Sequence, residues 1–170
     1  MLRTDVAVRG VQKYLKENPD ASASDISEVV INEQMASALK SHEKIHIFVR
    51  AVITSDFFKN KEIQKYAPTI VKITQKNPIM ERHLIAAIEG LCVDMGKIKL
   101  FPVMIKQLFD EDALQEDVIL EWAVDEGSEY TLDSVDEDNK AKLRAEADPL
   151  VNWLEEDSDD DSEDSDSDSE

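Results

Sequence analysis

Apolar residues recur at helical spacing through the first hundred residues of this chain, and this period restricts its possible folds more than any other feature. In one run, Ile45, Phe48, Val49 and Val52 share one helix face, and similar runs precede and follow it. No segment combines sustained period-two alternation with strand-like turns, and no Asn-Gly or Asp-Gly hairpin signal occurs. The sequence therefore predicts an all-α chain.

Capping residues, prolines and one glycine mark where these helices begin and end. The signals are a stop before Asn18-Pro19, caps at Ser22 or Ser24 and at Ser41, a break at Asn77-Pro78, Gly96 after a helix over 79–95, and Asp148-Pro149 as a cap followed by proline. A polar loop is expected over 127–139. Helices of ~12–18 residues joined by short loops favour antiparallel pairs that stack, an α-solenoid.

Length and composition limit the class of protein. The 170 residues fit one domain, and neither a transmembrane run nor a signal peptide is expected. The single cysteine, Cys92, excludes an internal disulfide and fits a reducing compartment and a buried position. The net charge of −19 is uneven: residues 1–107 carry 16 Lys and Arg against 12 Asp and Glu, whereas residues 108–170 carry 3 against 26. The C-terminal part should repel nucleic acid and attract basic partners.

Both tryptophans lie in acidic, apolar segments. We call residues 108–123 the first box and residues 149–157 the second box. At helical spacing Val118 and Trp122 would lie together with Leu114 one turn earlier, and carboxylates would cover the remaining surface. A tryptophan on such a helix is usually core, and carboxylates alone are usually a solvated face. Their density in two boxes favours a docking surface.

The two boxes resemble those of the W2 domain, the HEAT-like C-terminal domain of eukaryotic translation initiation factor 5. The first reads Phe109-Asp110-Glu111-Asp112, then Glu116, then Ile119-Leu120-Glu121-Trp122, and the second reads Pro149-Leu150-Val151-Asn152-Trp153-Leu154-Glu155-Glu156. Leu150 stands where the family usually has an aromatic residue. The resemblance implies a HEAT-like solenoid over residues 1–156, although the first hundred residues match only in pattern.

The resemblance also implies a function without catalysis. The family binds lysine-rich segments of the beta subunit of initiation factor 2, contacts initiation factors 3, 1 and 1A, assembles the preinitiation complex and favours GDP retention on factor 2. It implies a cytoplasmic monomer with no cofactor, no metal, no direct nucleic-acid contact and no membrane contact. The expected partner-binding residues are Asp110, Glu111, Asp112, Glu116, Asp117, Glu121, Trp122, Trp153, Glu155, Glu156 and Asp157.

Three alternatives stay open. The chain could be the W2 domain of the epsilon subunit of exchange factor 2B or a short competing W2 mimic, or it could be a general acidic chaperone for basic proteins. A remote alternative is a zinc hydrolase, because His42-Glu43-Lys44-Ile45-His46 spells H-E-x-x-H. We expect a surface-to-core helix there, and a solvated helix face around Glu81, Arg82 and His83. No nucleotide-binding glycine loop or hydrolase elbow occurs.

The last residues form an acidic, serine-rich tail. From Glu155 onward eleven acids and five serines leave no apolar residue to bury, so residues 157–170 are predicted to be disordered. Ser158, Ser165, Ser167 and Ser169 lie among acids, a context that an acidophilic kinase prefers, so we expect them as phosphorylation candidates.

Overall fold

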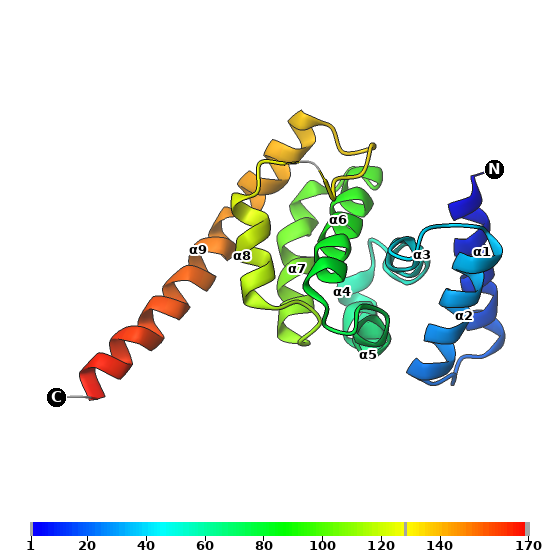
Figure 1. Ribbon diagram of the computed structural model, residues 1–170, viewed down its shortest axis with the longest axis horizontal. Helices are drawn as coiled ribbons and strands as arrows, with labels where there is room; N and C mark the ends of the chain where they lie inside the picture. Colours follow the sequence, from blue (N-terminus) through cyan, green and yellow to red (C-terminus); the bar gives the residue numbers. More distant parts are fainter. Residues whose placement is uncertain (1, 128, 169–170) are drawn as a thin grey trace.

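The helical solenoid expected from the sequence is present in the computed structural model of the protein (Figure 1). The structure describes residues 2–127 and 129–168, with side chains described as far as Asp157, and within these ranges it contains helices and no strand. The elements are α1 Arg3–Glu17, α2 Ala23–Ala36, α3 Glu43–Val52, α4 Phe57–Asn60, α5 Glu62–Thr74, α6 Pro78–Asp94, the 3₁₀ turn η1 Ile98–Leu100, α7 Phe101–Asp110, α8 Glu116–Val124 and α9 Glu137–Asp168. No helix in these ranges is both long and apolar enough to cross a membrane.

The helices stack in layers from one end of the molecule to the other. The pair α1 and α2 forms one end, α3 and α5 come next, α6 and α7 follow, and α8 and α9 form the opposite edge (Figure 1). Contacts run from α1 to α3, from α3 to α6, and from α7 and α8 to α9. The expected all-α, stacked architecture is therefore confirmed.

Helix α6 lies at the centre of this stack. It packs against α3, α5, α7, α8 and α9, and its buried residues surround the helix rather than follow one stripe. A helix that is apolar all round belongs inside a protein. Cys92 is fully buried on α6, as expected, and burial raises the pKa of its thiol to about 12, so the thiol stays protonated.

Most of the expected helix ends are confirmed. Ser22 caps α2 by accepting a hydrogen bond from the Asp25 amide, and Asn77 caps α6 ahead of Pro78. Gly96 has a φ of +65° directly after α6, the left-handed conformation that favours glycine. Ser41 is a different case, because α3 begins after His42 and has no side-chain cap.

Leu114 of the first box does not lie on the same helix as Val118 and Trp122, as the spacing had suggested. Helix α7 ends at Asp110, a turn follows, and α8 begins at Glu116. Asp112 has a φ of +63°, and the carbonyl oxygen of Leu108 accepts hydrogen bonds from the Ala113 and Leu114 amides, 2.8 and 3.2 Å away. These bonds satisfy the end of α7 and reverse the chain, so Leu114 contributes to the core from the turn.

The expected cap at Asp148-Pro149 is also wrong. Helix α9 starts twelve residues before Pro149 and passes through it. The cap is Asp136, whose side chain accepts a hydrogen bond of 2.8 Å from the Asn139 amide. Leu143, Ala147, Leu150 and Leu154 are buried along one stripe of α9, and this packing outweighs the hydrogen bond that the proline cannot donate.

The backbone of α9 is helical as far as Asp168, within the segment predicted to be disordered. Aspartate and serine are weak helix formers, and negative charge at a helix C-terminus opposes the helix dipole. The disorder of residues 157–170 in solution and the domain boundary at 156 stay predictions. The side chains of Ser158, Ser165 and Ser167 and the whole of Ser169 lie outside the described residues.

Candidate acidic and aromatic docking site

Trp122 of the first box lies in the core. Its exposed fraction is 5%, and its ring centroid lies 5.3 Å from that of Phe101 on α7. The indole N–H donates to Oε2 of the buried Glu89 at 3.4 Å, and the Arg144 guanidinium lies 5.3 Å from the centre of the ring. Burial raises the pKa of Glu89 to about 7. Trp122 therefore ties α8 to α6, α7 and α9 at once.

Arg82 neutralises part of the acidic surface from beneath. Its side chain is only 7% exposed, and it pairs with Glu121 at 3.1 Å and with Asp125 at 2.5 Å. The hydrogen bond from Arg82 is the main cause that lowers the pKa of Asp125. The expectation of a solvated helix face here was wrong, because α8 covers this end of α6 and buries both Arg82 and Glu81.

Two further carboxylates of the first box are held in ion pairs with lysines. Lys76 pairs with Asp112, and Lys106 pairs with Asp110 one turn away on α7. The Lys76 hydrogen bond is the main cause that lowers the pKa of Asp112. These pairs are exposed and contribute little stability, but they reduce the negative charge offered to a partner.

The remaining acids of the first box surround the start of α8. Glu111 and Asp117 are exposed and Glu116 is half-buried, and the described residues include no ion pair to any of the three. Glu116 and Asp117 occupy the first turn of α8, where negative charge favours the helix dipole. Beneath them the buried Glu81 accepts a hydrogen bond of 2.8 Å from the Gln115 amide. Burial is the main cause that raises the pKa of Glu81.

The second box meets the first at an aromatic pair. Trp153 is 42% exposed on α9, and its ring packs edge-on against Phe109 of α7 at 6.0 Å between centroids. The Lys106 ammonium lies 5.0 Å from the centre of the indole. Glu155, Glu156 and Asp157 follow directly and are exposed, and no described residue forms an ion pair with them. The structure therefore joins the two boxes into one edge of the molecule.

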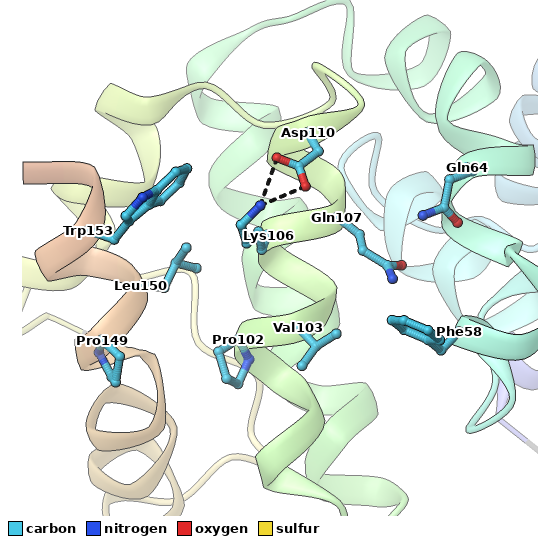
Figure 2. Close-up of a pocket in the computed structure, with 10 residues that line it drawn as sticks. All are labelled: Phe58, Gln64, Pro102, Val103, Lys106, Gln107, Asp110, Pro149, Leu150 and Trp153. Carbon is cyan, nitrogen blue, oxygen red and sulfur yellow. Dashed lines mark hydrogen bonds and ion pairs between the residues drawn. The ribbon is translucent and has the colours of Figure 1, made fainter. Parts of the chain in front are cut away.

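An apolar groove opens beside this edge (Figure 2). It encloses about 610 Å³ between α9 on one side, α7 below and α4 with the start of α5 on the other side. Its lining residues are Phe58, Gln64, Pro102, Val103, Lys106, Gln107, Asp110, Pro149, Leu150 and Trp153. Leu150 is 8% exposed and forms part of the wall.

The histidines form a cluster of their own on the other side of α6. The rings of His42 and His83 stack at 4.2 Å between centroids, and the ring of His46 lies 6.2 Å from that of His83. Burial is the main cause that lowers the pKa of both His46 and His83 to about 4. Within the described parts of the chain, no three His, Cys, Asp or Glu side chains are arranged to hold a metal ion. The H-E-x-x-H motif therefore gains no support as a zinc site.

Comparison with known proteins identifies the family. A family model described as W2: eIF4-gamma/eIF5/eIF2-epsilon matches residues 80–164, which is half of the chain and includes both boxes. The chain belongs to the W2 domain family. A solved structure, "The C-terminal Domain of Translation Initiation Factor 5 at low pH", superposes on this W2 domain with a TM-score of 0.70 at 18% identity, covering 94% of this chain and 96% of that one. At that identity the likeness shows the fold, and it confirms the HEAT-like solenoid.

Curated relatives of this W2 domain are copies of eukaryotic translation initiation factor 5. The protein of Drosophila melanogaster is 34% identical over 97 residues, which cover 55% of this chain and 20% of that protein. The protein of Caenorhabditis elegans is 24% identical over 159 residues, which cover 87% of this chain and 35% of that protein. The protein of Mus musculus is 29% identical over 111 residues, which cover 62% of this chain and 25% of that protein. The W2 domain thus spans a fifth to about a third of the length of these relatives.

Sequence reasoning missed three residues that shape the site: Arg82, Glu89 and Phe58. Arg82 and Glu89 lie on α6 three and four residues away from apolar neighbours, so their burial could have been suspected from the apolar run around them. Phe58 lies in a short connector, and no periodic signal marks its place in the wall of the groove opposite Trp153.

Proposed function

We propose that this W2 domain is an interaction module of a translation initiation factor that captures lysine-rich segments of the initiation factor 2 beta subunit. In this proposal it also contacts initiation factors 3, 1 and 1A in the cytoplasm, helps assemble the preinitiation complex and favours GDP retention on factor 2. Family membership and the factor 5 relatives support the role in initiation.

The observation that carries the proposal is the contact between the two boxes. Trp153 packs against Phe109, so the second box lies against the end of α7, directly before the turn that leads to α8. Within the two boxes, the exposed carboxylates that pair with no described residue are Glu111, Asp117, Glu155, Glu156 and Asp157, and Glu116 is half-buried before Asp117. Clustered carboxylates attract a lysine-rich segment over a distance, and its aliphatic stems can pack on nearby apolar surface.

Individual exposed ion pairs contribute only about 0–1 kcal/mol, so affinity must come from many contacts at once. Binding should therefore weaken steeply as salt is added. Added salt screens the charges, and in concentrated salt the Debye length falls to about 3 Å. Among the predicted contacts, Asp110, Asp112 and Glu121 already have basic partners within the domain. We therefore assign the larger share of the attraction to the unpaired carboxylates, and to Trp122 only the task of holding α8 in place.

Charge reversal tests this assignment. We expect Glu155→Lys with Glu156→Lys and Asp157→Lys, and separately Glu116→Lys with Asp117→Lys, each to lower the affinity for a lysine-rich factor 2 beta peptide at least about tenfold, measured by calorimetry in low salt. A control reversal of Asp25 and Glu28, exposed acids on α2, should change the affinity far less. If all three variants bind alike, or if the isolated tail binds as well as the domain, the box assignment is wrong.

A further inference from the structure

The groove beside the boxes contains three large apolar side chains that the core does not use. Phe58 on α4 is 69% exposed, Val103 on α7 is 38% exposed and Trp153 on α9 is 42% exposed. Figure 2 shows Phe58 and Trp153 on opposite sides of the groove, with Pro102 and Val103 of α7 between them. Apolar side chains gathered around one concave surface are typical of a binding site rather than of scattered surface residues.

Phe58 is not needed to anchor α4, because its neighbour Phe57 already does so. Phe57, the preceding residue, is 1% exposed and anchors the single turn of α4 in the core. The two rings lie edge-on at 6.4 Å, so Phe58 projects away from the core side of that turn. A second phenylalanine pointing outward is unfavourable for the isolated domain and favourable once another apolar side chain covers it.

The charges around the groove differ between its two walls. On the floor Lys106 is held by Asp110, with its Nζ 2.9 and 3.2 Å from the two carboxylate oxygens. Glu156 and Asp157 come three and four residues after Trp153, so they continue the same face of α9 beyond the groove. At the opposite wall Lys59 and Lys61 are exposed beside α4, with Asp56 and Glu62 flanking the same turn. The α9 wall is therefore continued by negative charge, whereas the α4 wall carries charges of both signs.

We propose that this groove seats the apolar side chains of the same lysine-bearing partner segment that the boxes attract. Apolar residues of that segment at i, i+4 and i+7 spacing fill the space between Phe58 and Trp153, in the manner of a helix in a groove. Its lysines lie at the end that reaches Glu156 and Asp157, because these exposed carboxylates attract them and the α4 end has no excess of negative charge. This inference rests on the proposed function and adds that the partner is recognised by apolar anchors as well as by charge.

Two synthetic peptides of equal charge separate the two contributions. Both carry the same lysine cluster at one end of a helical sequence, and one has leucines at i, i+4 and i+7 where the other has alanines. Calorimetry over a series of salt concentrations should show the same salt dependence for both peptides. It should show about tenfold tighter binding of the leucine peptide at every salt concentration, because salt screens charges and leaves apolar contacts intact.

Variants of the domain locate the preference. Phe58→Ser and Val103→Ser should each remove most of the preference for the leucine peptide while leaving the alanine peptide's affinity unchanged. Met35→Ser, at a 67% exposed methionine on α2, is the matched control and should keep the preference. All three positions are exposed, and unchanged far-ultraviolet circular dichroism would show that each variant is folded.

The possible outcomes distinguish the two proposals. Equal binding of both peptides by the wild-type domain overturns the groove as a subsite and leaves the charge-based function standing. Failure of both peptides to bind removes the proposed function and this inference together. A preference that survives Phe58→Ser and Val103→Ser assigns the anchors to another surface and overturns the inference. Self-association that Phe58→Ser abolishes, without any peptide preference, would give the groove to a second copy of the chain and overturn it as well.

Discussion

The surroundings of Trp122 and of Trp153 differ in nearly every physical respect, although the two segments look alike in sequence. Trp122 is buried, donates to a buried carboxylate and lies 5.3 Å from the Arg144 guanidinium, and Arg82 pairs with its neighbour Glu121. Trp153 is nearly half exposed, touches one aromatic ring and one lysine, and is followed by three unpaired carboxylates. The first environment serves the fold, and the second is the one that we propose for partner binding. Similar acidic and aromatic sequence motifs can therefore divide structure and binding between them.

The largest effect that should distinguish the two tryptophans is on stability. We expect Trp122→Ala to lower the free energy of unfolding by about 3–5 kcal/mol, because it removes a fully packed aromatic side chain and leaves a cavity between α6, α7 and α8. Urea unfolding followed by circular dichroism measures the change. Trp122→Phe, which keeps an aromatic ring and loses the N–H donor, is the matched control and should cost less. A loss below about 1 kcal/mol for Trp122→Ala would contradict the buried position.

A second difference between the two tryptophan regions is the pH dependence of stability. The Trp122 region should show it, because Trp122 contacts the titratable Glu89. Its folded-state pKa of about 7 lies above the ordinary value of 4.5, so the folded protein binds the proton more tightly than the unfolded chain. Stability from this group is fully present below pH 4.5 and is lost as pH rises through 7. Relative to wild type, Glu89→Gln should therefore become more stable by about 3 kcal/mol at most between pH 4.5 and 8.

The difference in stability between wild type and Glu89→Gln separates the effect of Glu89 from that of the histidines. The pH dependence of stability that the histidines cause has the opposite sign. His46 and His83 have pKa values of about 4 in the folded protein against 6.5 in the unfolded chain, so their contribution is lost as pH falls from 6.5 toward 4. The histidines are present in both proteins, and their contribution cancels in the difference. Urea denaturation of both proteins across this pH range gives the measurement, and a difference independent of pH would show that Glu89 ionises normally.

The same contrast explains what could and could not be predicted from sequence. Helical periodicity depends on neighbours within one element, so the all-α stack and the caps at Ser22, Asn77 and Gly96 could be predicted. The position of Leu114 in the turn depends on Asp112, a left-handed residue that is not glycine, for which the sequence has no clear signal. The cap expected at Pro149 failed because packing of a continuous apolar stripe outweighed a local preference.

The sequence could not show which carboxylates form ion pairs and which do not, for another reason. Arg82 and Glu121 are 39 residues apart in sequence and become neighbours only when α8 folds onto α6. The groove likewise brings together Phe58 of α4 and Trp153 of α9, on either side of α7. Composition could indicate where acids and aromatics gather, whereas tertiary contacts decide which of them stay available.

The smallest effect on stability is expected for a substitution of Trp153, and it tests the same contrast between the two tryptophans. Trp153→Ala should lower the free energy of unfolding by only about 1 kcal/mol, since it removes one edge-on aromatic contact with Phe109 and one exposed cation–π contact with Lys106. Its effect on binding should exceed its effect on stability, because the indole forms one wall of the groove next to Glu156 and Asp157. Unfolding in urea and peptide calorimetry on the same variant give both numbers. A stability loss as large as that of Trp122→Ala would show that Trp153 belongs to the core, and the distinction between the two boxes would then be lost.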